Sequence, residues 1–334
     1  MKKTISFLAV ILVLTVILSG CRTGGTKPVE SQGPVKIETV EIAAIKGPSA
    51  MGMVRLIQEI NALSDRLNIT FDIVPSPDIA GAGLVSGQYA IAALPTNMAS
   101  ILYNRTEGDL QLIAVNTLGT LFIVSRQDEQ ILSINDLKGK RVVTSGLGAV
   151  PEIILNHVLT SNGMDPGQDL RIEYKSEHSE VATLFSAGEA DIVMLPQPFV
   201  TVVLQRNSDA EISVDMTKEW EKLTGGLSLP MGCIVARKDF IAKYPEETRV
   251  FLETYKETMD WVLENPSLAA SGIVALDILP SEEIAGEALL NSNIVFYTAD
   301  ESKSMLQQFF RILHESNPAS IGGKVPGDDF YHTP

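Results

Sequence analysis

Residues 40–53 read VEIAAIKGPSAMGM, an apolar run that breaks at a Gly-Pro pair and resumes with the spacing of a helix. This order is typical of a buried strand, a tight turn and a helix. Gly47 allows a close backbone approach, Pro48 fixes φ for the first helical turn, and Ser49 is of a residue type that caps helices. Because the first N–H groups of a helix have no partner within it, the stretch predicts a turn suited to a small polar or anionic group.

The chain repeats this arrangement at a constant offset of 101 positions, which carries Gly47 onto Gly148. Residues 87–95 (GQYAIAALP) align at the same offset with residues 188–196 (GEADIVMLP). Two similar units predict two similar lobes. A βα turn without a ligand is the alternative interpretation of the first unit alone, because every parallel sheet contains several such turns.

Strand and helix patterns alternate along the chain, which predicts an α/β fold with a largely parallel sheet. The first amphipathic helix is expected to continue through Leu63 and Leu67, and the next strand to cover residues 69–74. Residues 112–124 and 223–236 are extended and contain glycine, so we expect the chain to leave the first lobe along one and return along the other. Two crossings permit a hinge.

The N-terminus has the pattern of a secretory signal. Two lysines precede an apolar run over residues 7–18, which is shorter than a membrane-spanning helix needs, and Leu18-Ser19-Gly20-Cys21 follows. This ending resembles a bacterial lipobox, which implies a lipoprotein signal peptide over residues 1–20 and a lipidated Cys21. An uncleaved anchor helix is the alternative. Residues 21–34 are rich in Gly, Thr, Ser and Pro and predict a flexible tether.

Charge and cysteine content exclude some partners and some chemistry. The signal removes two of the 26 basic residues, and the 24 that stay face 41 acidic residues, a formal charge near −17. Nucleic acid and anionic lipid are therefore poor partners for the folded part. With Cys21 acylated, Cys233 is the only other cysteine, so no internal disulfide is expected.

Three motifs resemble those of bacterial extracytoplasmic solute-binding proteins of the nitrate, sulfonate, taurine and thiamine-pyrimidine type, which feed ABC importers. They are Asp136-Leu137-Lys138-Gly139-Lys140 before a strand, the Ser-Gly-x-x-x-Ile-x-x-Leu-Pro unit at residues 86–95, and Arg237-Lys238-Asp239-Phe240 leading into Tyr244-Pro245-Glu246. The resemblance implies a type II periplasmic-binding-protein fold, with two α/β lobes joined by two crossing strands around a central cleft. Residues 35–118 and 231–334 would form lobe 1, and residues 119–230 lobe 2.

The resemblance also implies a function. Such a protein is a substrate-binding lipoprotein, a monomer anchored on the extracytoplasmic face of the cell membrane. It captures a small solute and delivers it to the permease and ATPase of an importer, without catalysis or a cofactor. One alternative is a ligand-sensing lipoprotein that presents its solute to a membrane receptor. Another is an enzyme like the fungal thiamine-pyrimidine synthases, against which the export signal and the lack of a Cys-rich motif argue.

In this family ligands are usually held at the βα turns and by a crossing strand. The matching positions of this chain are Ser49, Ala50 and Met51 in the first turn, Thr96 and Asn97 after the Leu-Pro strand, Asn116 and Thr117 in the outgoing crossing, and Ser145, Gly148, Ala149 and Gln197 in lobe 2. Alternative roles are open for some of them. Asn97 and Asn116 are of a type that also satisfies loose backbone groups, and Met51 is of a type that fills cores.

Catalytic and metal sites find little support. The histidines (His157, His178, His314 and His332) are scattered, and none has a Cys, Ser or acidic residue at a spacing that indicates a triad or a metal site. We interpret them as ordinary surface or core histidines. The Gly146-x-Gly148 turn matches no nucleotide-binding motif.

The candidate turns also predict the character of the ligand. They offer hydroxyls, amides and helix-start N–H groups, but Lys46 is their only cation. A fully charged sulfonate held without arginine would lose hydrogen bonds worth roughly 1.5–3 kcal/mol each. We therefore expect a small solute that is largely neutral or weakly anionic, a class that includes heteroaromatic compounds. Its acceptor atoms should lie over the helix starts at Ser49 and Ala149.

The lipobox gives the first testable prediction. Replacement Cys21→Ala removes the thiol that would be acylated, so the variant should stay unprocessed and should not incorporate palmitate in metabolic labelling. Cys233→Ala is the matched control and should be labelled like the unmodified protein. Unchanged labelling of the Cys21→Ala variant would show that the lipoprotein assignment is wrong.

Overall fold

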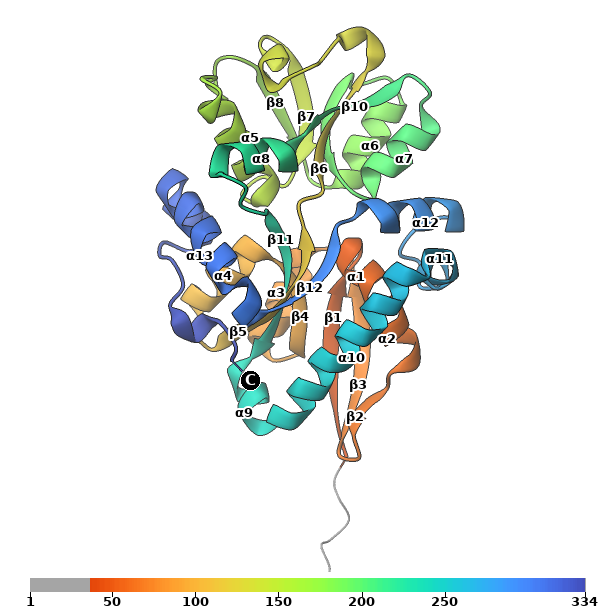
Figure 1. Cartoon of the computed structure of the whole chain (residues 1–334), viewed down its shortest axis with the longest axis vertical. Coiled ribbons are helices and arrows are strands. Elements are labelled where there is room, and N and C mark those ends of the chain that lie inside the picture. The colour runs from red at the N-terminus through yellow and green to blue at the C-terminus, as the bar shows by residue number, and fades with distance from the viewer. Residues whose placement is uncertain (1–36, 334) are drawn as a thin grey trace, which may run out of the picture. The chain divides into compact units, whose positions relative to one another are not determined.

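The computed structural model (Figure 1) describes residues 37–333. The expected signal peptide, Cys21 and the tether lie outside this range. The strands form two mixed sheets. Sheet 1 has the order β12-β5-β11-β4-β1-β3-β2, built from β1 (Glu38–Ile45), β2 (Ala62–Ser64), β3 (Leu67–Val74), β4 (Tyr89–Pro95), β5 (Leu110–Leu118), β11 (Pro230–Arg237) and β12 (Ile294–Thr298). Sheet 2 has the order β10-β6-β9-β7-β8, built from β6 (Leu121–Arg126), β7 (Arg141–Ser145), β8 (Arg171–Lys175), β9 (Ile192–Pro196) and β10 (Ala210–Asp215).

Helices pack around each sheet, and we call each sheet with its helices a lobe. Lobe 1 carries α1 (Pro48–Gly52), α2 (Val54–Glu59), α3 (Pro77–Ser86), α4 (Thr96–Arg105), α9 (Lys238–Lys243), α10 (Pro245–Glu264), α11 (Pro266–Ala275), α12 (Glu282–Asn291) and α13 (Ala299–Ser316). Lobe 2 carries α5 (Val150–Ser161), α6 (His178–Ser186), α7 (Phe199–Arg206) and α8 (Met216–Thr224). No helix within residues 37–333 is both long and apolar enough to cross a membrane.

The repeat seen in the sequence occupies equivalent places in the two sheets. In sheet 1, β1 lies between β3 and β4 and pairs with both in parallel; in sheet 2, β7 lies between β8 and β9 and does the same. The α/β fold with two lobes is confirmed. The expectation of a largely parallel sheet is correct only for these two groups of three parallel strands, β3-β1-β4 and β8-β7-β9. Elsewhere it is wrong, because the remaining strands pair antiparallel: β2, β5, β6, β10, β11 and β12.

The chain passes from sheet 1 to sheet 2 between β5 and β6, and returns between α8 and β11 (Figure 1). The outgoing stretch, expected as one extended segment, is interrupted at Gly119 and Thr120. A Cβ atom at Gly119 would lie 2.3 Å from the Thr217 hydroxyl oxygen, so the crossing needs a glycine here for space. The two crossings lie side by side, since Leu118 pairs with Pro230.

The helix expected to continue through Leu63 and Leu67 ends at Glu59 instead. Leu63 lies in β2 and Leu67 in β3, two antiparallel strands joined by a tight turn. Both leucines are buried in the lobe 1 core. Their spacing fits a helix face, but a hairpin buries the same two side chains by placing one on each strand.

The apolar core is continuous between the lobes where α8 meets α13. Trp220 of α8 is fully buried, and its ring centroid lies 5.8 Å from that of Phe309 in α13, in an edge-to-face contact. Both belong to one cluster that also contains residues of sheet 1 and sheet 2. The C-terminal helix therefore helps to pack both lobes.

A buried ion pair anchors the β2–β3 hairpin and generates the second prediction. Glu247 of α10 is 2% exposed, and it accepts hydrogen bonds from Arg66 Nε at 2.7 Å and from the Ser64 hydroxyl at 3.0 Å. The hydrogen bond from Arg66 is the main cause that lowers the pKa of Glu247. A lowered pKa means that this carboxylate stabilises the fold above the unfolded pKa of about 4.3, and that the stabilisation is lost as pH falls through the lower folded pKa.

Replacement Glu247→Gln should lower the free energy of unfolding at neutral pH by about 1 kcal/mol, a modest loss because Arg66 is half exposed. The difference from the unmodified protein should shrink as pH falls below the unfolded pKa of about 4.3 and vanish below the lower folded pKa, where Glu247 is neutral in both states. Urea unfolding at a series of pH values measures this, and Glu257→Gln, an exposed change on the same helix, is the control. A difference independent of pH would contradict the assignment.

Candidate functional site

The lobe 2 turn lies between β7 and α5. Gly146 and Gly148 have φ of 83° and 76°, in the left-handed region that favours glycine. The N–H of Gly148 donates to Glu152 Oε2 at 2.5 Å, and the N–H of Ala149 donates to the Gly146 carbonyl at 3.0 Å. These donors are therefore used within the turn. The N–H of Ala149 is thus not free for a ligand, and the placement of acceptor atoms of the solute over the start of α5 stays a prediction.

The first turn of lobe 1 also differs from expectation. Gly47, with φ of 130°, is the N-cap of α1, and Ser49 is its second residue and makes no capping hydrogen bond. Ala50 and Met51 are fully buried in the lobe 1 core. Lys46, the one cation of the predicted turns, pairs with Asp277 Oδ2 at 2.8 Å. Its charge is therefore already balanced.

Asn97 connects three segments of the chain. It lies at the start of α4 and is 2% exposed. Its Nδ2 donates to the Ser320 carbonyl at 3.2 Å and reaches the Gly148 carbonyl of lobe 2 at 3.5 Å. Its Oδ1 is buried without a partner among the described residues, as is the hydroxyl of the neighbouring Thr96. The structure thus brings Asn97 to the lobe 2 turn with an unused acceptor.

Asn116 and Thr117 lie on β5, both buried. The Thr117 hydroxyl donates to Asn116 Oδ1 at 3.4 Å. Asn116 Nδ2 makes no hydrogen bond of good geometry in the described part of the chain, and its polar neighbour is the Tyr255 hydroxyl, which is also buried and poorly satisfied. A Cβ atom at Gly232 of β11 would lie 2.7 Å from Asn116 Oδ1, so glycine makes room for this amide. An unpaired buried donor costs about 1–3 kcal/mol, and such groups in native proteins call for an explanation.

Gln197 follows β9 and is buried. Its Oε1 accepts hydrogen bonds from the N–H and the hydroxyl of Thr201, at 3.2 and 2.9 Å. This side chain therefore closes the start of α7. These two hydrogen bonds explain the position of Gln197 without a ligand. Its Nε2 makes no hydrogen bond within residues 37–333 and is therefore available to donate to a solute.

Sequence reasoning missed His178. Its Nδ1 is hydrogen-bonded to the Ser145 hydroxyl, and its ring centroid lies 5.6 Å from that of Phe199. Burial lowers the pKa of His178 to about 4, so the imidazole is neutral at neutral pH. The available signal was topological: His178 begins the helix that follows β8, the strand next to β7, and so lies at the same carboxyl edge as Ser145.

One group of predicted residues is thus assembled at a single edge. Asn97 reaches Gly148, and Ser145 reaches His178 from the same turn. Ala149 lies next to Gly148, whereas Ala50 and Met51 are part of the lobe 1 core. No group of three or more His, Cys, Asp or Glu in the described part of the chain is placed to hold a metal ion.

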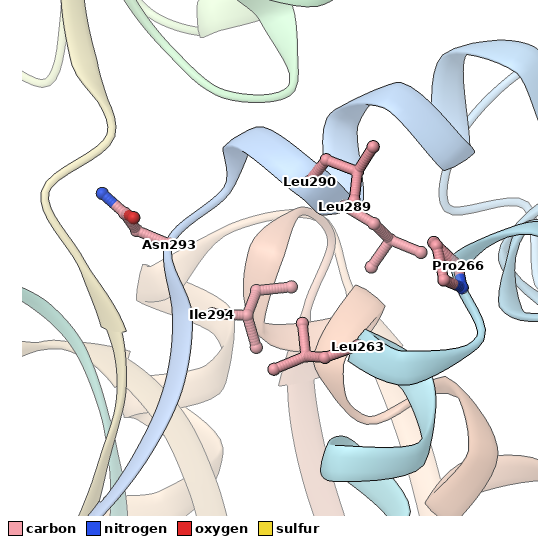
Figure 2. A pocket seen from close by; sticks show the side chains of 6 residues that line it. All are labelled: Leu263, Pro266, Leu289, Leu290, Asn293 and Ile294. Carbon is pink, nitrogen blue, oxygen red and sulfur yellow. The ribbon is translucent and has the colours of Figure 1, made fainter.

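Two cavities lie in lobe 1, away from the predicted residues. One of about 210 Å³ is lined by Leu263, Pro266, Leu289, Leu290, Asn293 and Ile294 (Figure 2). Figure 2 shows Asn293 pointing from its wall toward the β5–β6 crossing, where Asn293 Nδ2 donates to the Gly119 carbonyl at 2.5 Å. The other, of about 470 Å³, is lined by Thr39, Val40, Glu41, Thr70, Gly87, Gln88 and Ala90.

Comparison with solved structures defines the class of the fold. The chain is similar to an ABC transporter protein from Parabacteroides distasonis, with a TM-score of 0.74 and 21% identity over 90% of this chain and 99% of that one. It is also similar to the periplasmic aliphatic sulphonate binding protein SsuA from Escherichia coli, with a TM-score of 0.69 and 17% identity over 88% and 96% of the two chains. The fold is that of a periplasmic solute-binding protein of type II.

Sequence comparison gives the family. The chain belongs to the NMT1/THI5-like family, whose model matches residues 86–269. It is 26% identical to the L-cystine-binding protein TcyK of Bacillus subtilis over 206 residues, 57% of this chain and 72% of that protein. It is 22% identical to the putative binding protein YtlA of Bacillus subtilis over 146 residues, a match that spans 44% of this chain and about two fifths of that protein.

The unpaired amide of Asn116 gives the third prediction. Replacement Asn116→Ala should weaken binding of the solute that co-purifies with the protein by about 1–3 kcal/mol, because a polar group of the solute would lose its partner. Stability should change little, since Nδ2 makes no hydrogen bond of good geometry within the described chain and Oδ1 accepts only the long bond from Thr117 at 3.4 Å. Asn97→Ala should weaken binding similarly and also reduce stability, because its bond to the Ser320 carbonyl is lost.

The solute is identified by mass spectrometry after denaturation. Its calorimetric titration then measures the change in affinity, and urea unfolding measures the change in stability. The control is Asn61→Ala, an exposed asparagine of lobe 1. Unchanged affinity in both the Asn97 and the Asn116 variants would rule out this placement of the site.

Proposed function

We propose that this chain is the substrate-binding lipoprotein of an ABC importer, a monomer that captures a small solute in a cleft between its lobes and delivers it to a membrane permease. Family membership and the shared fold support this proposal. The observation that carries it is the buried amide oxygen of Asn97, which has no partner among the described residues although the same side chain reaches the lobe 2 turn. With it go the poorly satisfied Thr96 hydroxyl and Asn116 amide, whose polar neighbours are Cys233 and Tyr255. A solute that supplies the missing partners would remove the penalty for burying them.

The proposed site has no catalytic machinery. Ser145 and His178 form a hydrogen-bonded pair, but no carboxylate contacts the imidazole among the described residues to complete a triad. Cys233 is fully buried, and burial raises the pKa of its thiol, which makes it a poor nucleophile. We therefore propose a binding role without catalysis, anchored through Cys21 on the extracytoplasmic face of the membrane.

The solute that we propose is small and uncharged or only weakly charged. Lys46 is neutralised by Asp277, and the carboxylate of Glu152 already occupies the start of α5. An anion placed there would compete with Glu152 and find no free cation. Nitrate and sulfonates are the ligands in the names of several solved structures with this fold, and they fit these charges poorly.

Movement of the lobes is the fourth prediction and the test of the function. Two polar contacts between described residues join the lobes. Asn97 reaches the Gly148 carbonyl at 3.5 Å, a long hydrogen bond, and Gln205 of α7 donates to Glu287 of α12 at 2.6 Å, a bond on the lobe surface that a hinge motion would exchange for water. The scattering radius of gyration should be smaller with the co-purifying solute at saturation than after its removal. An identical profile in both states would take lobe closure out of the proposed mechanism.

A second measurement separates the importer from a receptor. The permease and ATPase encoded beside the gene should bind the solute-loaded protein in a pull-down from membranes. Binding only to a sensory receptor would support the ligand-sensing alternative.

A further inference from the structure

His178 is held in one orientation at the carboxyl edge of sheet 2. It is the first residue of α6, its Nδ1 is bonded to the Ser145 hydroxyl, and its ring packs against Phe199 with an interplanar angle of 44°. The side chain is half-buried, as is that of Phe199. Its Nε2 makes no hydrogen bond within residues 37–333. One nitrogen of the ring is thus fixed by the protein and the other is free.

The bond to Ser145 decides where the imidazole proton lies. Ser145 is 1% exposed, and His178 Nδ1 is the only acceptor that its hydroxyl meets in the described chain. If Nδ1 carried the proton, the buried hydroxyl would have no acceptor. Ser145 therefore donates to Nδ1, and the neutral imidazole carries its proton on Nε2. The free nitrogen is a hydrogen-bond donor without a charge.

The surroundings of this donor disfavour an anionic acceptor. Gly148, three residues after Ser145, holds the Glu152 carboxylate at 2.5 Å. Lys175, which pairs with Ser145 across β7 and β8, is bound to Glu173 at 3.0 Å, and Lys46, the cation of the predicted turns, is paired with Asp277. The neighbouring unpaired group from lobe 1 is Asn97 Oδ1, also uncharged. The two lobes thus offer one neutral donor and one neutral acceptor at the same turn.

We propose that His178 is a specificity-determining residue of the solute site, where its Nε2–H donates to an uncharged acceptor of the solute, a carbonyl oxygen or a ring nitrogen. Ser145 is then a positioning residue, because it acts on the solute through the tautomer and orientation of His178. The proposal rests on the binding function proposed above, and it adds the group that selects neutral over anionic solutes.

The tautomer can be tested without any solute. In a long-range nitrogen-15 correlation spectrum of the histidine-labelled protein at neutral pH, His178 should show a protonated Nε2 and an unprotonated Nδ1. His157, His314 and His332 serve as internal references in the same spectrum. A protonated Nδ1 would overturn the proposal. Replacement Ser145→Ala should move the Nδ1 resonance, while Ser176→Ala, an exposed serine just before α6, should not.

The donor role is tested with two small probes at matched millimolar concentration. N-methylacetamide, an uncharged carbonyl probe, should shift the His178 Nε2 resonance at least about threefold more than methanesulfonate does, and this preference should disappear in the Ser145→Ala variant. The references should shift equally with both probes. A larger shift with methanesulfonate, or no shift with either, would overturn the proposal.

A His178→Gln variant, which keeps an N–H donor near the position of Nε2, should retain the co-purifying solute better than His178→Leu. Equal retention by the two would count against a donor role. Failure of the permease pull-down would defeat the importer function and leave the spectral results standing, whereas a protonated Nδ1 would defeat only the role given to His178.

Discussion

The pairing of β5 with β11 is the constraint on which the architecture depends. These strands run antiparallel between β12 and β4 of sheet 1 and remain paired up to Leu118 and Pro230, where the chain leaves for sheet 2 and where it returns. Both connections therefore start from neighbouring points of one rigid sheet. Gly119 then passes so close to Thr217 that a side chain would not fit, and Asn293 donates to its carbonyl. The proposed hinge would lie at this point.

The same constraint organises the chemistry of the candidate site. The β7–α5 turn of lobe 2 and the β4–α4 turn of lobe 1 meet where Asn97 reaches Gly148. Buried amides and hydroxyls gather there, whereas the charged groups that sequence inspection would assign to a ligand are already used. Lys46 is bound to Asp277 and Glu152 closes its own helix start. Uncharged hydrogen-bonding groups are what this region has left for a solute.

Local features of the sequence predicted the fold well, and long-range contacts explain where the prediction was wrong. The strand-turn-helix units around Gly47 and Gly148 were visible because glycine, proline and apolar runs report backbone geometry directly. Leu63 and Leu67 were assigned to a helix because residues four positions apart lie on one helix face. The same spacing also fits a hairpin with one leucine on each strand, and packing in the lobe 1 core selects the hairpin.

The candidate site shows the same division. Asn97, Ser145 and Gly148 were found as turn residues, but their partners were not. The bond between Ser145 and His178 joins positions 33 residues apart, and it exists only because β8 lies next to β7 in sheet 2. Strand order is a property of the whole fold, so no local pattern around His178 could reveal its role.

The contact between Trp220 and Phe309 bears on how the chain is made. Phe309 belongs to α13, which comes after both crossings and near the end of the chain, yet it completes the packing around a tryptophan of lobe 2. During synthesis the chain emerges from its N-terminus onward. Lobe 2 is therefore complete in sequence before α13 has been made. In the interval Trp220 has its neighbour His157 within lobe 2 but lacks Phe309, so this part of the lobe 2 core stays uncovered until α13 packs against it.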